Sequence, residues 1–120
     1  MSYKIAAASS DGIYVDRHFG HADLFYITEI SDGGMCRFLE KRTVLSPCRH
    51  GVHDLQIMQE AVKLIADCQY VLCEAVGAGA AAILGQHHIT PLETDESIDN
   101  AIRNIILYKK RVKNLQRTCS

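Results

Sequence analysis

Two histidines that lie three positions apart, His18 and His21, are the residues of this sequence best suited to chemistry. They occupy a short segment between two apolar runs, which is typical of a loop between strands. Neutral imidazole is the commonest metal ligand among protein side chains, and Gly20 would let the backbone approach a bound group closely. The pattern predicts a ligand-binding loop formed by His18, Phe19, Gly20 and His21. The alternative is that one histidine bonds a backbone carbonyl while the other is solvated.

A second group of potential ligands comprises Cys48, His50 and His53. A thiolate is a soft ligand that suits iron, and imidazole is a borderline ligand. We expect the loops before a strand at 23–30 and after a strand at 35–44 to lie at one end of a hairpin, where the two groups could form one pocket. Iron–sulfur clusters normally use four thiolates, so this pocket suits a preassembled guest cluster better. A polar connection without ligands is the alternative.

The elements that must position these residues follow from hydrophobic periodicity and turn residues. Apolar or alternating runs predict strands at residues 3–8, 23–30, 35–44, 70–74 and 88–92. Helical spacing predicts helices at 54–67, at 77–84 and from about residue 95 onward. Gly85 is expected to end the second helix, and Pro91 is expected to close the last strand. The order β-β-β-α-β-α-β-α predicts a mixed five-stranded sheet, with an antiparallel meander first and parallel strands later.

A glycine-rich turn follows the strand predicted at 70–74. Gly77 and Gly79 open a predicted helix with the spacing Gly-x-Gly-x-x-Ala, and Glu93 follows the next strand. This is the context of a dinucleotide fingerprint, so a nucleotide-binding regulatory module is one alternative function. Only one β-α-β unit surrounds the turn, which disfavours a full dinucleotide site. Glu74 precedes the turn and could orient a histidine, or it could be a solvated carboxylate.

The composition is that of one α/β domain. The 120 residues, of which 48% are hydrophobic, are sufficient for a packed core. No stretch is long and apolar enough for a membrane span or a secretory signal, so we expect a cytoplasmic protein without a membrane partner. Five cysteines without a Cys-x-x-Cys argue against a disulfide framework and a zinc ribbon. Cys68 and Cys73 fall on predicted core elements.

Charge is distributed unevenly along the chain. Up to Tyr108 there are eight basic and fourteen acidic residues, and after it there are five basic and no acidic residues. This predicts a cofactor-binding α/β domain at 1–108 and a basic C-terminal helix extension at 109–120. The acidic domain disfavours nucleic acid as a partner. The basic end could dock on an assembly protein, as in a metal-free interaction adaptor, and Val112 and Leu115 are candidates for a homodimer contact.

Several segments together resemble one protein family. They are residues 7–12, 18–23, 25–27, 37–42, 67–73, 76–80 and 88–92. With them, over about residues 3–105, the chain resembles the dinitrogenase iron–molybdenum cofactor biosynthesis family, whose members include NifX, NafY and the C-terminal domain of NifB. The resemblance implies a ribonuclease-H-like α/β domain that binds iron–sulfur precursors of the nitrogenase cofactor. Such a domain carries its cargo between cofactor-assembly proteins in nitrogen fixation.

The resemblance implies a stand-alone carrier rather than an enzyme. Ribonuclease-H enzymes need strand carboxylates where this chain has Ala6, Ala7 and Ala8, so the fold does not imply nuclease activity. The expected cofactor-binding residues are His18, Phe19, Gly20, His21, Gly77 and Gly79. The expected metal ligands are His18, His21, Cys48, His50 and His53. The expected cargo is an iron–sulfur cluster or an iron–molybdenum cofactor precursor, which the carrier must both protect and release.

Overall fold

The computed structural model describes residues 2–43 and 54–118. Its strands are β1 (Tyr3–Ala8), β2 (Leu24–Ile30), β3 (Cys36–Thr43), β4 (Tyr70–Cys73) and β5 (Thr90–Glu93). Its helices are α1 (Asp54–Leu64), α2 (Ala78–Gln86) and α3 (Ile98–Thr118), and a short 3-10 turn spans Phe19–His21. Apart from that turn, the elements follow the predicted β-β-β-α-β-α-β-α order.

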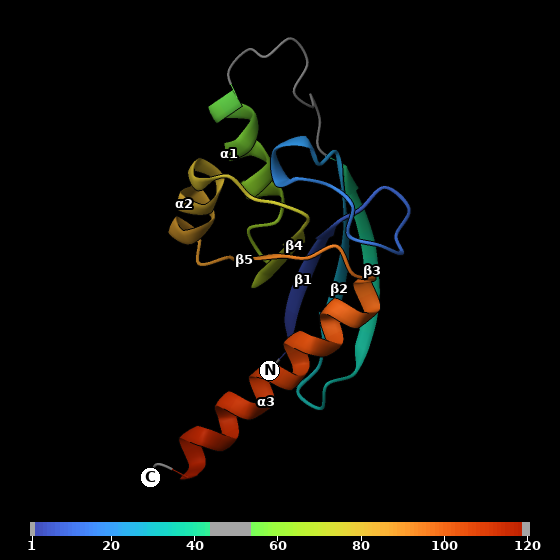
Figure 1. The fold of residues 1–120 in the computed structure, drawn as a ribbon, viewed down its shortest axis with the longest axis vertical. Helices are drawn as coiled ribbons and strands as arrows, with labels where there is room; N and C mark the ends of the chain where they lie inside the picture. Colours follow the sequence, from blue (N-terminus) through green and yellow to red (C-terminus); the bar gives the residue numbers. More distant parts are fainter. Residues whose placement is uncertain (1, 44–53, 119–120) are drawn as a thin grey trace.

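The five strands form one mixed sheet in the order β3-β2-β1-β4-β5. The pairs β1–β2 and β2–β3 are antiparallel, which confirms the meander. In the β2–β3 turn, Gly34 has a φ of 85°, a conformation that glycine adopts without strain. The pairs β1–β4 and β4–β5 are parallel, because a helix intervenes before each second strand. Helices α1 and α2 cover one face of the sheet and α3 covers the other (Figure 1).

Two apolar layers hold the sheet between these helices, and β1 shows how one strand serves both. Ile5 and Ala7 belong to the layer under α3, whereas Ala6 and Ala8 belong to the layer under α1 and α2. All four side chains are at most 1% exposed. A strand that is buried on both faces has a continuous apolar sequence rather than an alternating one. The unbroken run at 5–8 is therefore the sequence of the central strand.

The end of α2 differs from the prediction. Gly85 lies inside the helix, which continues to Gln86. The chain leaves the helix at His88, whose φ of 60° is in the left-handed region. The N–H of Ile89 then donates to the carbonyl oxygen of Leu84 at 2.9 Å, which satisfies a carbonyl of the last turn. Glycine usually takes this left-handed position, so the sequence pattern pointed to the wrong residue.

The boundaries of β5 and α1 also differ from the prediction. β5 begins at Thr90 rather than at residue 88, and Pro91 lies inside the strand instead of closing it. An edge strand tolerates proline, because the missing N–H is not needed on its open side. Helix α1 ends at Leu64, before the predicted residue 67. The carbonyl oxygen of Leu64 accepts a hydrogen bond from Arg42 at 3.0 Å, which satisfies a group at that helix end.

Helix α3 begins at Ile98, later than the predicted start near residue 95. The Oγ of Ser97 accepts the N–H of Asn100 at 3.2 Å, as an N-cap side chain does. The helix then continues without a break to Thr118, so the basic residues after Tyr108 extend the same helix. Among the helices of the described ranges, none combines the length and the apolar character that crossing a membrane requires.

Candidate functional site

The candidate site lies where the carboxyl ends of three parallel strands meet. β1 ends at Ala8, β4 at Cys73 and β5 at Glu93, and parallel pairing brings these ends to one edge of the sheet. The segment with His18 and His21 follows β1, and the glycine-rich turn follows β4. In open α/β sheets, ligands bind outside this edge. Two sequence regions that are far apart in the chain therefore arrive at the same edge.

Side chains next to β1 hold the first part of the histidine segment in shape. Ser9 is fully buried, and its Oγ accepts the N–H of Gly12 at 2.9 Å. One carboxylate oxygen of Asp11 accepts the N–H groups of Ile13 and Tyr14 at 2.8 and 3.0 Å. These backbone N–H groups lower the pKa of Asp11, because they stabilise its charged form. Ser9 and Asp11 thus shape the start of the loop through bonds to its backbone.

The histidines are fixed by the backbone that surrounds them. The N–H of Phe19 donates to the carbonyl oxygen of Ala75 at 2.9 Å, and the N–H of Glu74 donates to that of Arg17 at 2.8 Å. Phe19 is only 2% exposed, and its ring centroid lies 5.9 Å from that of Phe25 in the core. Phe19, a predicted binding residue, is therefore buried and anchors the loop in the core. Its neighbours His18 and Gly20 are exposed.

His18 and His21 are exposed and close to each other. Their ring centroids are 6.2 Å apart, in an edge-to-face arrangement. The Nε2 of His18 lies 3.2 Å from a carboxylate oxygen of Glu74, and the two side chains are 56% and 43% exposed. A carboxylate at one ring nitrogen favours the proton there and leaves the other nitrogen available as a ligand. The structure thus places Glu74 where it can orient a histidine, as the sequence suggested.

The glycines of the site have room around them. A side-chain carbon added at Gly20, Gly77 or Gly79 would meet no other atom within 4 Å. Gly77 is the N-cap of α2 and has an ordinary extended conformation, with a φ of -74°. Packing within the described residues therefore does not require glycine at these positions. Open backbone at the start of a helix is suited to a group that carries negative charge.

Glu93 has a structural role at the same edge. Its carboxylate accepts the N–H of Val76 at 2.8 Å, and the N–H of Thr94 donates to the carbonyl oxygen of Cys73 at 2.9 Å. The first bond fixes the glycine-rich turn to the end of β5, and the second joins the ends of β4 and β5. In a dinucleotide site the corresponding acidic residue binds a ribose hydroxyl. Glu93 instead accepts a hydrogen bond from the backbone N–H of Val76.

The second predicted ligand group, Cys48, His50 and His53, lies outside the described residues. Thr43, the last described residue before it, pairs with Leu24 at the edge where β1 ends. Within residues 2–43 and 54–118, no group of three or more His, Cys, Asp or Glu side chains could hold a metal ion. Joint ligation by the two groups therefore stays a prediction.

None of the three described cysteines is placed as a ligand of the site: two are buried, and the third is on the surface away from it. Cys68 and Cys73 are 4% and 0% exposed, within the core under α1 and α2. Burial raises the pKa of the Cys68 thiol to about 12 and that of the Cys73 thiol to about 11. Thiols with such pKa values are protonated and inert at neutral pH. Cys36 is exposed at the start of β3, away from the histidine loop.

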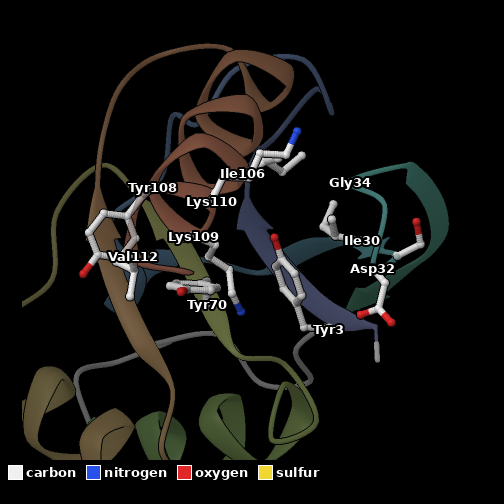
Figure 2. A pocket seen from close by; sticks show the side chains of 11 residues that line it. Tyr3, Ile30, Asp32, Gly34, Tyr70, Ile106, Tyr108, Lys109, Lys110 and Val112 are labelled. Carbon is white, nitrogen blue, oxygen red and sulfur yellow. The ribbon is translucent and has the colours of Figure 1, made fainter. Parts of the chain in front are cut away.

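A cavity of about 500 Å³ beside α3 contains a feature that the sequence analysis missed (Figure 2). The Nζ of Lys109 lies 3.8 Å from the ring centroid of Tyr3 and 3.0 Å from the side-chain oxygen of Gln69. The ring of Tyr70 is 5.6 Å away from the same Nζ. Lys109 lies four residues after Ile105, on the same face of α3 as the apolar residues. A lysine at such a position can pack its aliphatic stem against the apolar surface beneath the helix. The first residue of the basic extension therefore contacts the domain.

The fold defines an α/β domain whose candidate site lies at the carboxyl edge of the sheet. Residues 1–107 match the model of the dinitrogenase iron-molybdenum cofactor family. The chain therefore belongs to this family, which confirms the resemblance seen in the sequence.

The matches to NifB and NifY cover most of this chain but only part of each relative. The chain is 31% identical over 104 residues to the FeMo cofactor biosynthesis protein NifB of Frankia alni, a match that covers 84% of this chain and 20% of NifB. It is 32% identical over 88 residues to Protein NifY of Klebsiella pneumoniae, covering 73% of this chain and 36% of NifY. The apo form of the orange protein from Desulfovibrio gigas has the same fold, with a TM-score of 0.59 at 18% identity and 87% coverage of both chains. This chain thus corresponds to about a fifth of NifB and about a third of NifY.

Proposed function

We propose that this protein binds an iron–sulfur precursor of the iron–molybdenum cofactor and carries it between cofactor-assembly proteins in the cytoplasm. Membership of the dinitrogenase cofactor family and the names of NifB and NifY support this class of cargo. The observation that carries the proposal is the exposed pair His18 and His21, held at the carboxyl edge of the sheet beside a glycine-rich turn. The role is binding and transfer rather than catalysis.

The donor set suits a cargo that must be released. His18 and His21 offer two imidazoles on an exposed loop, and Glu74 orients the first of them. A cluster that already has its own bridging sulfides needs only a few replaceable protein ligands. Open backbone at Gly77 and Gly79 gives an anionic cluster space to approach the amides at the start of α2. Cys48, His50 and His53 are proposed as additional ligands from the segment after β3.

The proposal is tested by loading the full chain anaerobically with a purified iron–sulfur precursor of the cofactor. Retained iron is measured after gel filtration, together with the visible absorption spectrum. We expect His18→Ala and His21→Ala each to lower the retained iron while the melting temperature stays nearly unchanged, because both side chains are on the surface. His87→Ala is the matched control, since His87 is an exposed histidine at the end of α2.

Two outcomes separate this role from a structural one. If the His18 and His21 variants retain as much iron per folded molecule as the His87 control, the histidines are not cargo ligands. Cys48→Ser should lower retained iron and weaken the sulfur-to-iron charge-transfer absorption, because thiolate binds iron more firmly than imidazole does. An unchanged spectrum in Cys48→Ser removes that residue from the ligand set.

A further inference from the structure

A groove lies between strand β3 and helix α3, separate from the histidine loop. Its cavity is about 500 Å³, which is within the range of ligand pockets. The lining residues that matter here are Thr28, Cys36, Phe38, Arg103, Leu107 and Lys110. The first three come from the sheet and the last three from one side of α3.

Large apolar side chains are exposed around this groove. Phe38 is 57% exposed on the strand side, and Leu107 is 49% exposed on the helix side. Single exposed apolar residues are ordinary, but two that line one cavity from opposite elements favour an interaction surface. Neither Phe38 nor Leu107 is needed to complete either of the two buried layers.

The backbone of β3 offers the groove a second means of binding. β3 is at the edge of the sheet, where it pairs with β2 alone among the described strands. An open edge presents N–H and C=O groups that can pair with an added strand. The register shift opposite Ile27 and Thr28 leaves Leu39 as an extra residue. This bulge interrupts the edge, so regular pairing beside the groove is confined to the short stretch around Cys36–Phe38.

The charge on the helix side indicates the kind of partner. Arg103 and Lys110 form no ion pair with any residue in the described part of the chain. Asp99 is the one carboxylate among the lining residues, a full turn before Arg103. A second copy of this chain would bring its own Arg103 and Lys110, and like charges that face each other repel. An acidic partner complements the groove.

We propose that this groove binds a short, extended, acidic segment of a partner protein, with the pattern acidic-x-apolar-x-acidic. Alternate residues of a strand point to one side, so the two acids and the apolar residue would all face α3. The acids meet Arg103 and Lys110, and the apolar residue enters between Phe38 and Leu107. The lengths agree, since four strand steps span about 13 Å and seven helix steps from Arg103 to Lys110 span about 10 Å.

The test uses the full chain without cargo and a fluorescein-labelled peptide, Ser-Glu-Thr-Leu-Thr-Glu-Ser, followed by fluorescence anisotropy. The control peptide, Ser-Thr-Glu-Leu-Glu-Thr-Ser, has the same composition but turns its acids to the opposite side of a strand. We expect the first peptide to bind more tightly, and added salt to weaken its binding. Lys110→Gln should weaken binding by up to about fivefold, the upper range for one exposed ion pair. Leu107→Ser should weaken it as well.

Lys63→Gln is the matched control variant, because it removes one exposed lysine from α1 on the other face of the sheet. Equal affinity for the two peptides, or equal weakening by Lys63→Gln and Lys110→Gln, would mean unspecific charge attraction and would overturn the proposal. So would absence of binding at millimolar peptide. A concentration-dependent dimer that Leu107→Ser dissociates would show that a second copy occupies the groove. Because no cargo is present, these results are independent of the cluster-binding test.

Discussion

Arg42 and Asp67 form a two-bonded ion pair, with Nη1–Oδ1 and Nη2–Oδ2 distances of 2.6 and 3.0 Å. Arg42 is near the end of β3, and Asp67 follows α1. The Nζ of Lys4 also lies 3.0 Å from Asp67. Hydrogen bonding to Arg42, followed by that to Lys4, holds the pKa of the Asp67 carboxyl well below its usual range. The pair therefore joins the ends of the two elements that flank residues 44–53.

Asp67→Asn should lower the free energy of unfolding by on the order of 1 kcal/mol at pH 7, because the Asp67 side chain is 44% exposed and solvent partly screens the pair. The folded-state pKa is depressed, so the contribution of Asp67 is fully present above its unfolded pKa of about 4. It is lost as the pH falls further. Urea unfolding at pH 7 and at pH 3 should therefore show a smaller difference between Asp67→Asn and the parent at the lower pH. Asp23→Asn, at an exposed position, should show neither effect.

Glu74→Ala should reduce cargo retention about tenfold, the lower end of what loss of a ligand's hydrogen-bond partner costs. The reason is that His18 loses the carboxylate 3.2 Å from its Nε2. Stability should change by less than about 0.5 kcal/mol, as for other exposed side chains. Glu74→Gln keeps an oxygen acceptor and should retain more cargo than Glu74→Ala. Equal retention in Glu74→Ala and in the exposed helix variant Glu60→Ala would exclude this role.

Hydrophobic patterning together with turn residues was sufficient to predict the order of the elements and the mixed sheet. The continuous run of β1, the alternation in β2 and the helical spacing of the apolar residues in α3 each correspond to a distinct pattern of burial in the structure. The hairpin after Ile30 and the parallel strands followed from turn residues and from the intervening helices. Local periodicity determines which faces must be buried, and few topologies satisfy that requirement.

The arrangement of the site could be predicted only in part. That His18 and the glycine-rich turn share one edge follows from the parallel pairing of β1 with β4. The contact between His18 and Glu74 depends on two backbone hydrogen bonds between segments more than fifty residues apart, which no local pattern specifies. The same holds for Lys109 over Tyr3, since it joins the last helix to the first strand.

Gly79→Ala should stabilise the protein by up to about 1 kcal/mol, because alanine is the better helix former and the added carbon meets no atom within 4 Å. It should nevertheless reduce cargo retention, because the added methyl group occupies space that the proposed cluster needs at the start of α2. Gly85→Ala is the matched control, since Gly85 lies in the same helix with equally open surroundings. Gly85→Ala should stabilise the fold and leave cargo retention unchanged. Thermal unfolding measures the stability of both variants, and iron analysis measures the cargo that they retain. Equal cargo retention in Gly79→Ala and Gly85→Ala would mean that the cluster does not bind at the start of α2.

Thiol reactivity should separate the described cysteines in a variant with Cys48→Ser and Cys119→Ser. Cys36 is exposed and should react rapidly with an aromatic disulfide reagent. Cys68 and Cys73 should react only after denaturant is added, because their burial raises both pKa values and blocks access. Counting the thiols released before and after unfolding checks this. Rapid reaction of a second thiol in the native protein would show that the core opens around Cys68 or Cys73.

We predict that the basic end of α3, residues 109–118, contacts an assembly partner. Of this segment, only Lys109 is expected to stabilise the fold. A chain that ends at Val112 keeps Lys109 over Tyr3 and should retain the parent's stability. A chain that ends at Tyr108 loses this contact and the bond to Gln69, and should be less stable by about 1 kcal/mol. Both chains should take up cargo, because the histidine loop is unaffected.

Transfer of cargo to an acceptor should be slower from the chain that ends at Val112, which lacks Lys113 and Arg117. In the full chain, transfer should slow as salt rises, because exposed charges are screened over about 10 Å at 0.1 M salt. Transfer is measured as iron that moves to a separable acceptor protein. Unchanged transfer from this shorter chain would exclude docking by the basic end. Aggregation or early melting of the same chain would instead assign the removed residues to the core or to a dimer contact.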